Sequence, residues 1–183
     1  LCLPPRLWRS RGVLPESGIA AVFGASGSGK SFLAIDIAMA IAEGQEWFGY
    51  RVNRAPVVYA ALEGEAGIAG RVSAYRIARG EPGDGIRFLV GRFNLLDPTE
   101  VAELASAIRA AGGVGGVVIL DTLNRAAPDA DENDSKDMGA IIEAAKSLQR
   151  ELGGLVVLVH HTGKDASKGP RGHSSLLAAL DGA

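Results

Sequence analysis

The eight residues Gly24–Ser31 combine a flexible backbone with a cation and a hydroxyl. Their order matches the pattern G-x-x-x-x-G-K-S/T in full. Glycines let the backbone curl so that successive N–H groups point inward at phosphate oxygens. Lys30 would neutralise charge on the β- and γ-phosphates, and the Ser31 hydroxyl would reach Mg²⁺. The pattern predicts a nucleotide phosphate site formed by Gly24, Ala25, Ser26, Gly27, Ser28, Gly29, Lys30, Ser31 and Phe32.

A second chemical group follows an apolar run further along the chain. Val117–Leu120 is wholly apolar and is followed directly by Asp121. The carboxyl ends of parallel strands lie at the ligand edge of a sheet, so Asp121 and the phosphate loop should share that edge. We therefore expect Asp121 to hold Mg²⁺ together with Ser31. The alternative reading is an aspartate that merely ends a strand.

The elements that must position these groups are indicated by hydrophobic patterning, which alternates short apolar runs with longer helical ones. Apolar runs with little alternation indicate strands covered on both faces, and intervening helices indicate right-handed crossovers. The predicted class is α/β, with an open, mostly parallel central sheet flanked by helices. The expected strands are Ile19–Phe23, Val57–Leu62, Ile86–Val90, Val117–Leu120 and Leu155–Val159. The expected helices are Lys30–Glu43, Glu65–Arg79, Thr99–Ala111 with Thr99 as N-cap, and Asp137–Glu151.

Composition limits the class of protein. The chain has 183 residues and a net charge of −2, and 47% of its residues are hydrophobic. Neither a transmembrane run nor a signal peptide is evident, and the single cysteine excludes a disulfide framework, so we expect a cytoplasmic protein with no membrane association. The near-neutral charge excludes an overall basic nucleic-acid binder but leaves room for a local basic patch.

Four segments in this order resemble one group of proteins: the phosphate loop, Val57–Glu65, the segment 120–125 and the segment 158–164. Together they are similar to the RecA-fold ATPases of the plasmid RepA type, which are hexameric replicative helicases, and to phage and plasmid primase–helicase domains. The resemblance spans about residues 15–181. It implies a RecA-like P-loop core at 18–183, truncated at its C-terminal end, after an irregular lead-in at 1–17. It also implies ATP as the nucleotide, a homohexamer, single-stranded DNA as partner, and fused or associated replication domains.

The resemblance also assigns catalytic roles. Glu63 matches the carboxylate that polarises the attacking water, with Glu65 as the fallback; a helix-start carboxylate favoured by the helix dipole suits Glu65 better than Glu63. His160 and His161 match a position that senses the γ-phosphate, and His161 is the better match. A structural histidine pair and a metal site remain alternatives. The catalytic set is therefore Glu63, Lys30, Asp121 and His161.

The segment Gly163–Ser174 is rich in cations and small residues. The resemblance places the equivalent loop at the DNA channel of a ring, and mobile cations can follow a phosphate backbone. Arg171 is also the nearest candidate for an arginine finger that reaches the neighbouring subunit. A solvated basic loop is the alternative. The residues expected to contact DNA or a neighbouring subunit are Lys164, Lys168 and Arg171.

Three functions are compatible with these motifs. The first is Mg²⁺-dependent ATP hydrolysis that drives a helicase along single-stranded DNA. The second is a regulatory ATPase similar to KaiC or RecA, which uses the nucleotide as a conformational switch without helicase activity. The third is a small-molecule kinase, which the apolar strand before Asp121 and the histidine pair fit poorly.

Overall fold

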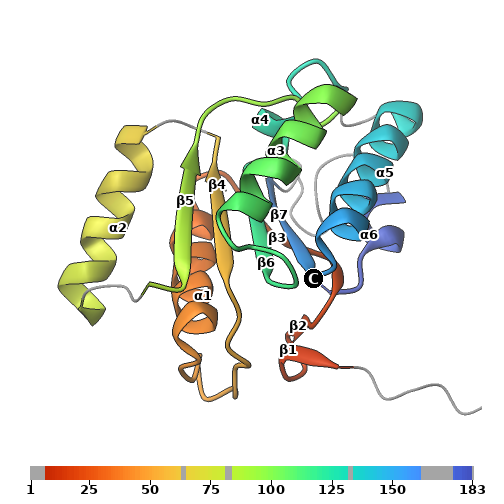
Figure 1. Cartoon of the computed structure of the whole chain (residues 1–183). Helices are drawn as coiled ribbons and strands as arrows, with labels where there is room; N and C mark the ends of the chain where they lie inside the picture. The colour runs from red at the N-terminus through yellow and green to blue at the C-terminus, as the bar shows by residue number, and fades with distance from the viewer. Residues whose placement is uncertain (1–6, 63–64, 81–83, 132–133, 162–174, 183) are drawn as a thin grey trace, which may run out of the picture.

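The computed structural model describes residues 7–62, 65–80, 84–131, 134–161 and 175–182 (Figure 1). A five-stranded sheet forms its centre, and every neighbouring pair of strands in it is parallel. The order across the sheet is β3-β7-β6-β4-β5, so β7 lies between β3 and β6. This arrangement confirms the predicted α/β class. The strands are β3 (Gly18–Gly24), β4 (Val57–Ala61), β5 (Ile86–Val90), β6 (Val117–Asp121) and β7 (Leu155–His161).

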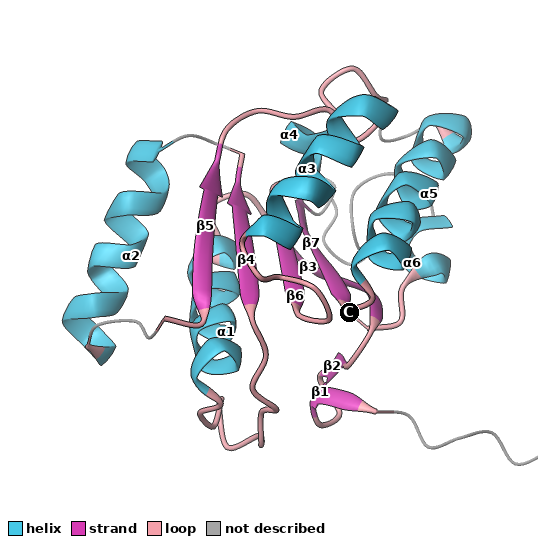
Figure 2. Ribbon diagram, in the orientation of Figure 1, coloured by secondary structure: helices cyan, strands magenta, loops and turns pink. Residues whose placement is uncertain are grey.

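Helices cover both faces of this sheet, as Figure 2 shows. On one face α1 (Lys30–Glu43) and α2 (Glu65–Arg79) pack in an apolar cluster with alternate residues of the strands. On the other face α3 (Pro98–Ala110) and α5 (Ser135–Leu152) pack on the residues in between. In β6, for example, Val117 and Ile119 belong to the α1 face, whereas Val118 and Leu120 belong to the α5 face. Burial on both faces explains why the strand sequences show no polar alternation.

The prediction of an irregular lead-in is wrong for part of residues 1–17. The strands β1 (Trp8–Ser10) and β2 (Leu14–Pro15) pair in an antiparallel hairpin. Arg9 is 5% exposed, and its guanidinium donates hydrogen bonds of 3.4 Å to the carbonyl oxygens of Glu16 and Gly115. Burial lowers the Arg9 pKa. The hairpin is thereby tied to the turn that precedes β6, an interaction that local sequence patterns do not reveal.

Helix α3 begins differently from the prediction. Its N-cap is Asp97, whose Oδ1 accepts hydrogen bonds from the backbone N–H groups of Thr99 at 2.8 Å and Glu100 at 3.4 Å. Pro98 occupies the first turn, where its missing N–H is not needed. Thr99 is therefore already inside the helix, and the expectation that it caps the helix is wrong.

Two short helices complete the described chain. The four-residue α4 (Leu123–Ala126) follows β6 closely, and α6 (Ser175–Ala179) packs on α5 through the apolar cluster of that face. After α6, Gly182 forms a parallel bridge with Ala20 at the edge of β3. Within the described ranges, no helix is both long and apolar enough to cross a bilayer.

Candidate functional site

The loop between β3 and α1 has the backbone conformation that its glycines permit. Gly27 and Gly29 have φ angles of 74° and 87°, in the left-handed region that favours glycine. A Cβ atom on Gly24 would lie 2.9 Å from the Ser28 hydroxyl, so a side chain there would require this hydroxyl to move. At Gly27 and Gly29 a Cβ would meet nothing within 4 Å, and the glycines there serve backbone conformation. The loop thus curves around an open volume at the start of α1.

Lys30 is the first residue of α1 and folds back over this loop. Its side chain is buried, and its ammonium donates hydrogen bonds to the carbonyl oxygens of Gly24 at 3.0 Å and Ala25 at 2.8 Å. A third hydrogen bond of 3.1 Å joins Nζ to Nδ1 of His161. An ammonium has three donors and no acceptor, so Nδ1 of His161 must be the acceptor. The ammonium of Lys30 is therefore held by the loop backbone and by the end of β7.

A cavity of about 240 Å³ opens beside the ammonium. The first turn of α1 contributes to its wall, and the unpaired N–H groups and positive dipole end of a helix favour anions. A cationic side chain from α2, Arg71, lies on the same wall. The cavity therefore suits a phosphate chain. It is lined by Ser26, Gly27, Gly29, Lys30, Ser31, Phe32, Arg71, Thr122 and His161.

Asp121 is the last residue of β6, next in the chain to the cavity wall. It is 3% exposed and precedes Thr122, which lines the cavity. Its Oδ2 accepts a hydrogen bond from the Tyr59 hydroxyl, whereas its buried Oδ1 has no hydrogen-bond partner among the described residues. Carboxylate and hydroxyl oxygens are ligands that Mg²⁺ prefers. In their chemistry, Oδ1 of Asp121 and the hydroxyl of Ser31 are thus suited to a magnesium ion bound with phosphate.

The two histidines at the end of β7 point to opposite faces of the sheet. Val157 and Val159 belong to the cluster that packs on α1, and His161 continues this alternation. His161 consequently reaches Lys30 and the cavity. His160 points to the opposite face of the sheet and is fully buried. No group of three or more metal-binding side chains occurs in the part of the chain that the structure describes, so the metal alternative for this pair gains no support.

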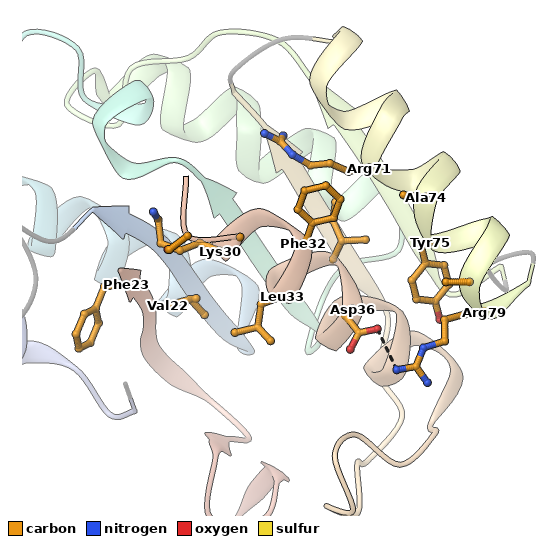
Figure 3. A pocket seen from close by; sticks show the side chains of 14 residues that line it. Val22, Phe23, Lys30, Phe32, Leu33, Asp36, Arg71, Ala74, Tyr75 and Arg79 are labelled. Atoms are coloured by element: carbon orange, nitrogen blue, oxygen red, sulfur yellow. Dashed lines mark ion pairs between the residues drawn. The ribbon is translucent and has the colours of Figure 1, made fainter. Parts of the chain in front are cut away.

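A larger cleft of about 660 Å³ adjoins the phosphate cavity and lies between α1 and α2 (Figure 3). Phe32 and Arg71 border both spaces. Phe32 is 54% exposed, which is high for an aromatic side chain next to a cavity. At the far end, Arg79 forms an ion pair of 3.8 Å with Asp36, and Tyr75 lies beside it. Sequence analysis missed Arg71, although the spacing of Arg71, Tyr75 and Arg79 places all three on one helix face.

Comparison with known families agrees with this site. A family model described as an AAA domain matches residues 2–167. The chain belongs to the AAA domain family. Among the solved structures that share its fold is a KaiC-like protein from the hyperthermophilic archaeon Pyrococcus horikoshii OT3, with a TM-score of 0.58 and 17% identity over 88% of this chain and 72% of that one. This AAA domain accordingly has the fold of a RecA-like P-loop ATPase. A search of curated proteins finds no match.

Several predicted residues of the AAA domain lie outside the described residues. They include the proposed catalytic carboxylate and the three cations of the basic segment: Glu63, Lys164, Lys168 and Arg171. Glu65 begins α2. The described structure brings together Lys30, Ser31, Phe32 and His161 around one cavity, and Asp121 is buried next to Thr122 of its wall.

Proposed function

We propose that this AAA domain binds and hydrolyses Mg²⁺·ATP. The observation that carries the proposal is the phosphate-loop lysine: its ammonium lies between the loop carbonyls and His161, at the wall of a cavity that also receives the N-terminus of α1. This arrangement concentrates positive charge and N–H donors where a triphosphate would bind. Family membership and the RecA-like fold support the same reaction.

Each residue around the cavity would have a distinct task. Lys30 would exchange loop carbonyls for β- and γ-phosphate oxygens. Ser31 and Asp121 would hold Mg²⁺, which when bound neutralises phosphate charge during transfer. His161 would contact the γ-phosphate, and Glu63 would orient the attacking water. The products are ADP and inorganic phosphate, formed as water adds to phosphorus and the bond to the β-phosphate oxygen breaks.

The adjoining cleft would receive the nucleoside. The exposed ring of Phe32 offers a face for stacking on a base, and the Arg71 guanidinium borders both the cleft and the phosphate cavity. The cleft extends between α1 and α2 as far as the Asp36–Arg79 ion pair. A base bound there would keep its phosphates within reach of the loop.

Binding is tested with Lys30→Met, which keeps a similar side-chain length without the charge. We expect its affinity for ATP to fall by more than about tenfold, because hydrogen bonds to charged groups contribute about 1.5–3 kcal/mol each. Lys136→Met is the matched control, since Lys136 is exposed at the start of α5. Equal affinity of both variants for ATP, measured by calorimetry, would contradict the proposal.

We propose further that hydrolysis drives a homohexameric ring along single-stranded DNA. The support is the ordered set of four motifs that resembles RepA-type helicases, together with the cations at Lys164, Lys168 and Arg171. On this proposal, single-stranded DNA stimulates ATP turnover, and the stimulation declines as salt is added because phosphate contacts are screened. A rate of ATP turnover that single-stranded DNA leaves unchanged at low salt would contradict this proposal.

The likeness to a KaiC-like structure favours a second candidate, a nucleotide switch without helicase activity. In that case the oligomeric state, followed by light scattering, would respond to ATP while DNA leaves turnover unchanged. Both candidates use the same hydrolytic site, so the comparison with and without DNA separates them.

A further inference from the structure

Tyr59 is a fully buried polar side chain in the middle of β4. Its hydroxyl donates a hydrogen bond of 2.5 Å to Oδ2 of Asp121 in the neighbouring strand β6. In the parallel pairing of these strands Tyr59 lies opposite Ile119, two residues before Asp121. Residues two apart in a strand face the same side, so the Tyr59 ring runs diagonally along the α1 face toward Asp121.

The position of this ring is fixed by its neighbours. Phe88 of β5 lies opposite Tyr59 in the register, and the two ring centroids are 5.6 Å apart. Tyr59 also belongs to the apolar cluster that packs on α1. A ring held on these sides directs its hydroxyl to one place, so the hydrogen bond holds the Asp121 carboxylate in one orientation.

The two carboxylate oxygens of Asp121 consequently differ in their hydrogen bonding. Oδ2 is engaged by the phenol, whereas Oδ1 is buried and has no hydrogen-bond partner in the described part of the chain. A carboxylate that binds a metal is commonly oriented by a hydrogen bond to its other oxygen, and loss of such a partner weakens metal binding. We propose that Tyr59 is a positioning residue, which directs Oδ1 of Asp121 toward the Mg²⁺ that accompanies the nucleotide.

This inference rests on the proposed function and differs from a merely structural role. A buried tyrosine needs a hydrogen-bond partner in any case, and Asp121 could serve only to satisfy it. A structural role predicts that removing the hydroxyl alters stability alone. A positioning role predicts that Mg²⁺ binding weakens while metal-free nucleotide binding is unchanged, because the phosphates would contact the loop and α1 whether or not the metal is present.

The test is the variant Tyr59→Phe, which removes the hydroxyl and keeps the ring. Binding of a fluorescent ADP is titrated with Mg²⁺, and also measured in excess EDTA. We expect the Mg²⁺ concentration for half-maximal enhancement of ADP binding to rise about tenfold, as is typical for loss of a partner of a metal ligand. Affinity for ADP in EDTA should stay unchanged, which also shows that the site is folded. Tyr50→Phe is the matched control, since that tyrosine is 48% exposed in a distant turn.

A second background shows whether Tyr59 acts through Asp121. In Asp121→Asn, adding Tyr59→Phe should change the Mg²⁺ titration no further, because the carboxylate that it orients is gone. An unchanged half-maximal Mg²⁺ concentration in Tyr59→Phe, or an equal additional shift in the Asp121→Asn background, would overturn the inference while leaving nucleotide binding intact. Absence of any Mg²⁺-dependent ADP binding by the parent protein would instead overturn the proposed function, and the inference with it.

Discussion

Replacing His161 by alanine should tighten the binding of ADP. In the structure the ammonium of Lys30 donates hydrogen bonds to Gly24, Ala25 and His161. The ammonium can bind a phosphate oxygen only after at least one of these hydrogen bonds breaks. In a variant without His161, water replaces the hydrogen bond between Lys30 and His161. Fewer hydrogen bonds to protein groups must then break when ADP binds, so binding costs less free energy.

The size of the effect follows from that one bond. A hydrogen bond with a charged partner contributes about 1.5–3 kcal/mol. Because His161 is partly exposed, the contribution of its hydrogen bond to Lys30 should lie at or below the lower end of this range. A net value of about 1–1.5 kcal/mol corresponds to a five- to tenfold increase in ADP affinity. ATP should behave differently on the proposed role of His161. The loss of a contact to the γ-phosphate in the bound state offsets the gain, so ATP affinity should change little.

The assay is calorimetric titration with Mg²⁺·ADP and with a non-hydrolysable ATP analogue, on the parent, His161→Ala and His161→Gln. The preference for ATP over ADP should fall about five- to tenfold in His161→Ala. His161→Gln should restore much of it, since an amide offers both an acceptor for Lys30 and a donor for phosphate. Equal tightening for both nucleotides would refute γ-phosphate sensing, and weaker ADP binding would refute the argument from Lys30.

Three further predictions concern stability. Asp97→Ala should lower the free energy of unfolding by about 1 kcal/mol because it removes the N-cap of α3, whereas Thr99→Ala should have little effect in the same urea titration. Gly154→Ala should lower the free energy of unfolding by at least about 2 kcal/mol, since its Cβ would collide with the Gly116 carbonyl oxygen. Gly139→Ala, in an exposed and open part of α5, should raise it by about 0.5–1 kcal/mol. Urea titrations of the two variants should therefore give changes of opposite sign. Burial, followed by the charges of Glu43 and Asp36, raises the Tyr75 pKa. The folded state then holds this proton more tightly than the unfolded state, so stability should fall as pH rises above about 10, and Tyr75→Phe should reduce that fall in denaturation measured from pH 9 to 11.

Much of the sheet could be predicted from the sequence because its strands are buried on both faces. The ranges expected for α1, α2 and β5 agree with the structure at both ends. Such elements carry strong apolar patterns bounded by glycine or polar residues. The order β3-β7-β6-β4-β5 did not follow from the residues, since it depends on which strands pair across long sequence separations.

The hairpin of β1 and β2 illustrates why other parts could not be predicted. Its burial of Arg9 depends on the Gly115 carbonyl, which is 106 residues away in the sequence. The local sequence before residue 17 contains three prolines and several arginines, a composition that is typical of an irregular segment. The same limit applies to Tyr59, whose partner Asp121 lies 62 residues further along the chain.

The candidate site was predictable to the extent that it follows a contiguous motif. The phosphate loop and Asp121 are positions that their spacing and strand ends indicate. The contributions of Arg71 and Tyr59 come from α2 and from the middle of β4, and the sequence patterns assigned neither residue a chemical role. Their proximity is a result of packing, because α2 lies on the same sheet face as α1.

The order of the strands places His161 between the phosphate loop and the end of β6. Because β7 lies between β3 and β6, its last residue stands between the phosphate loop and the strand that ends in Asp121. His161 is bonded to Lys30, and the chain continues from it directly into the segment that contains Lys164, Lys168 and Arg171. A change of hydrogen-bond partner at Lys30 on nucleotide binding would act at the start of this basic segment. On the proposed function, that one residue would connect the phosphate state to contacts with DNA or a neighbouring subunit, so His161→Ala should weaken DNA stimulation of turnover more than turnover itself.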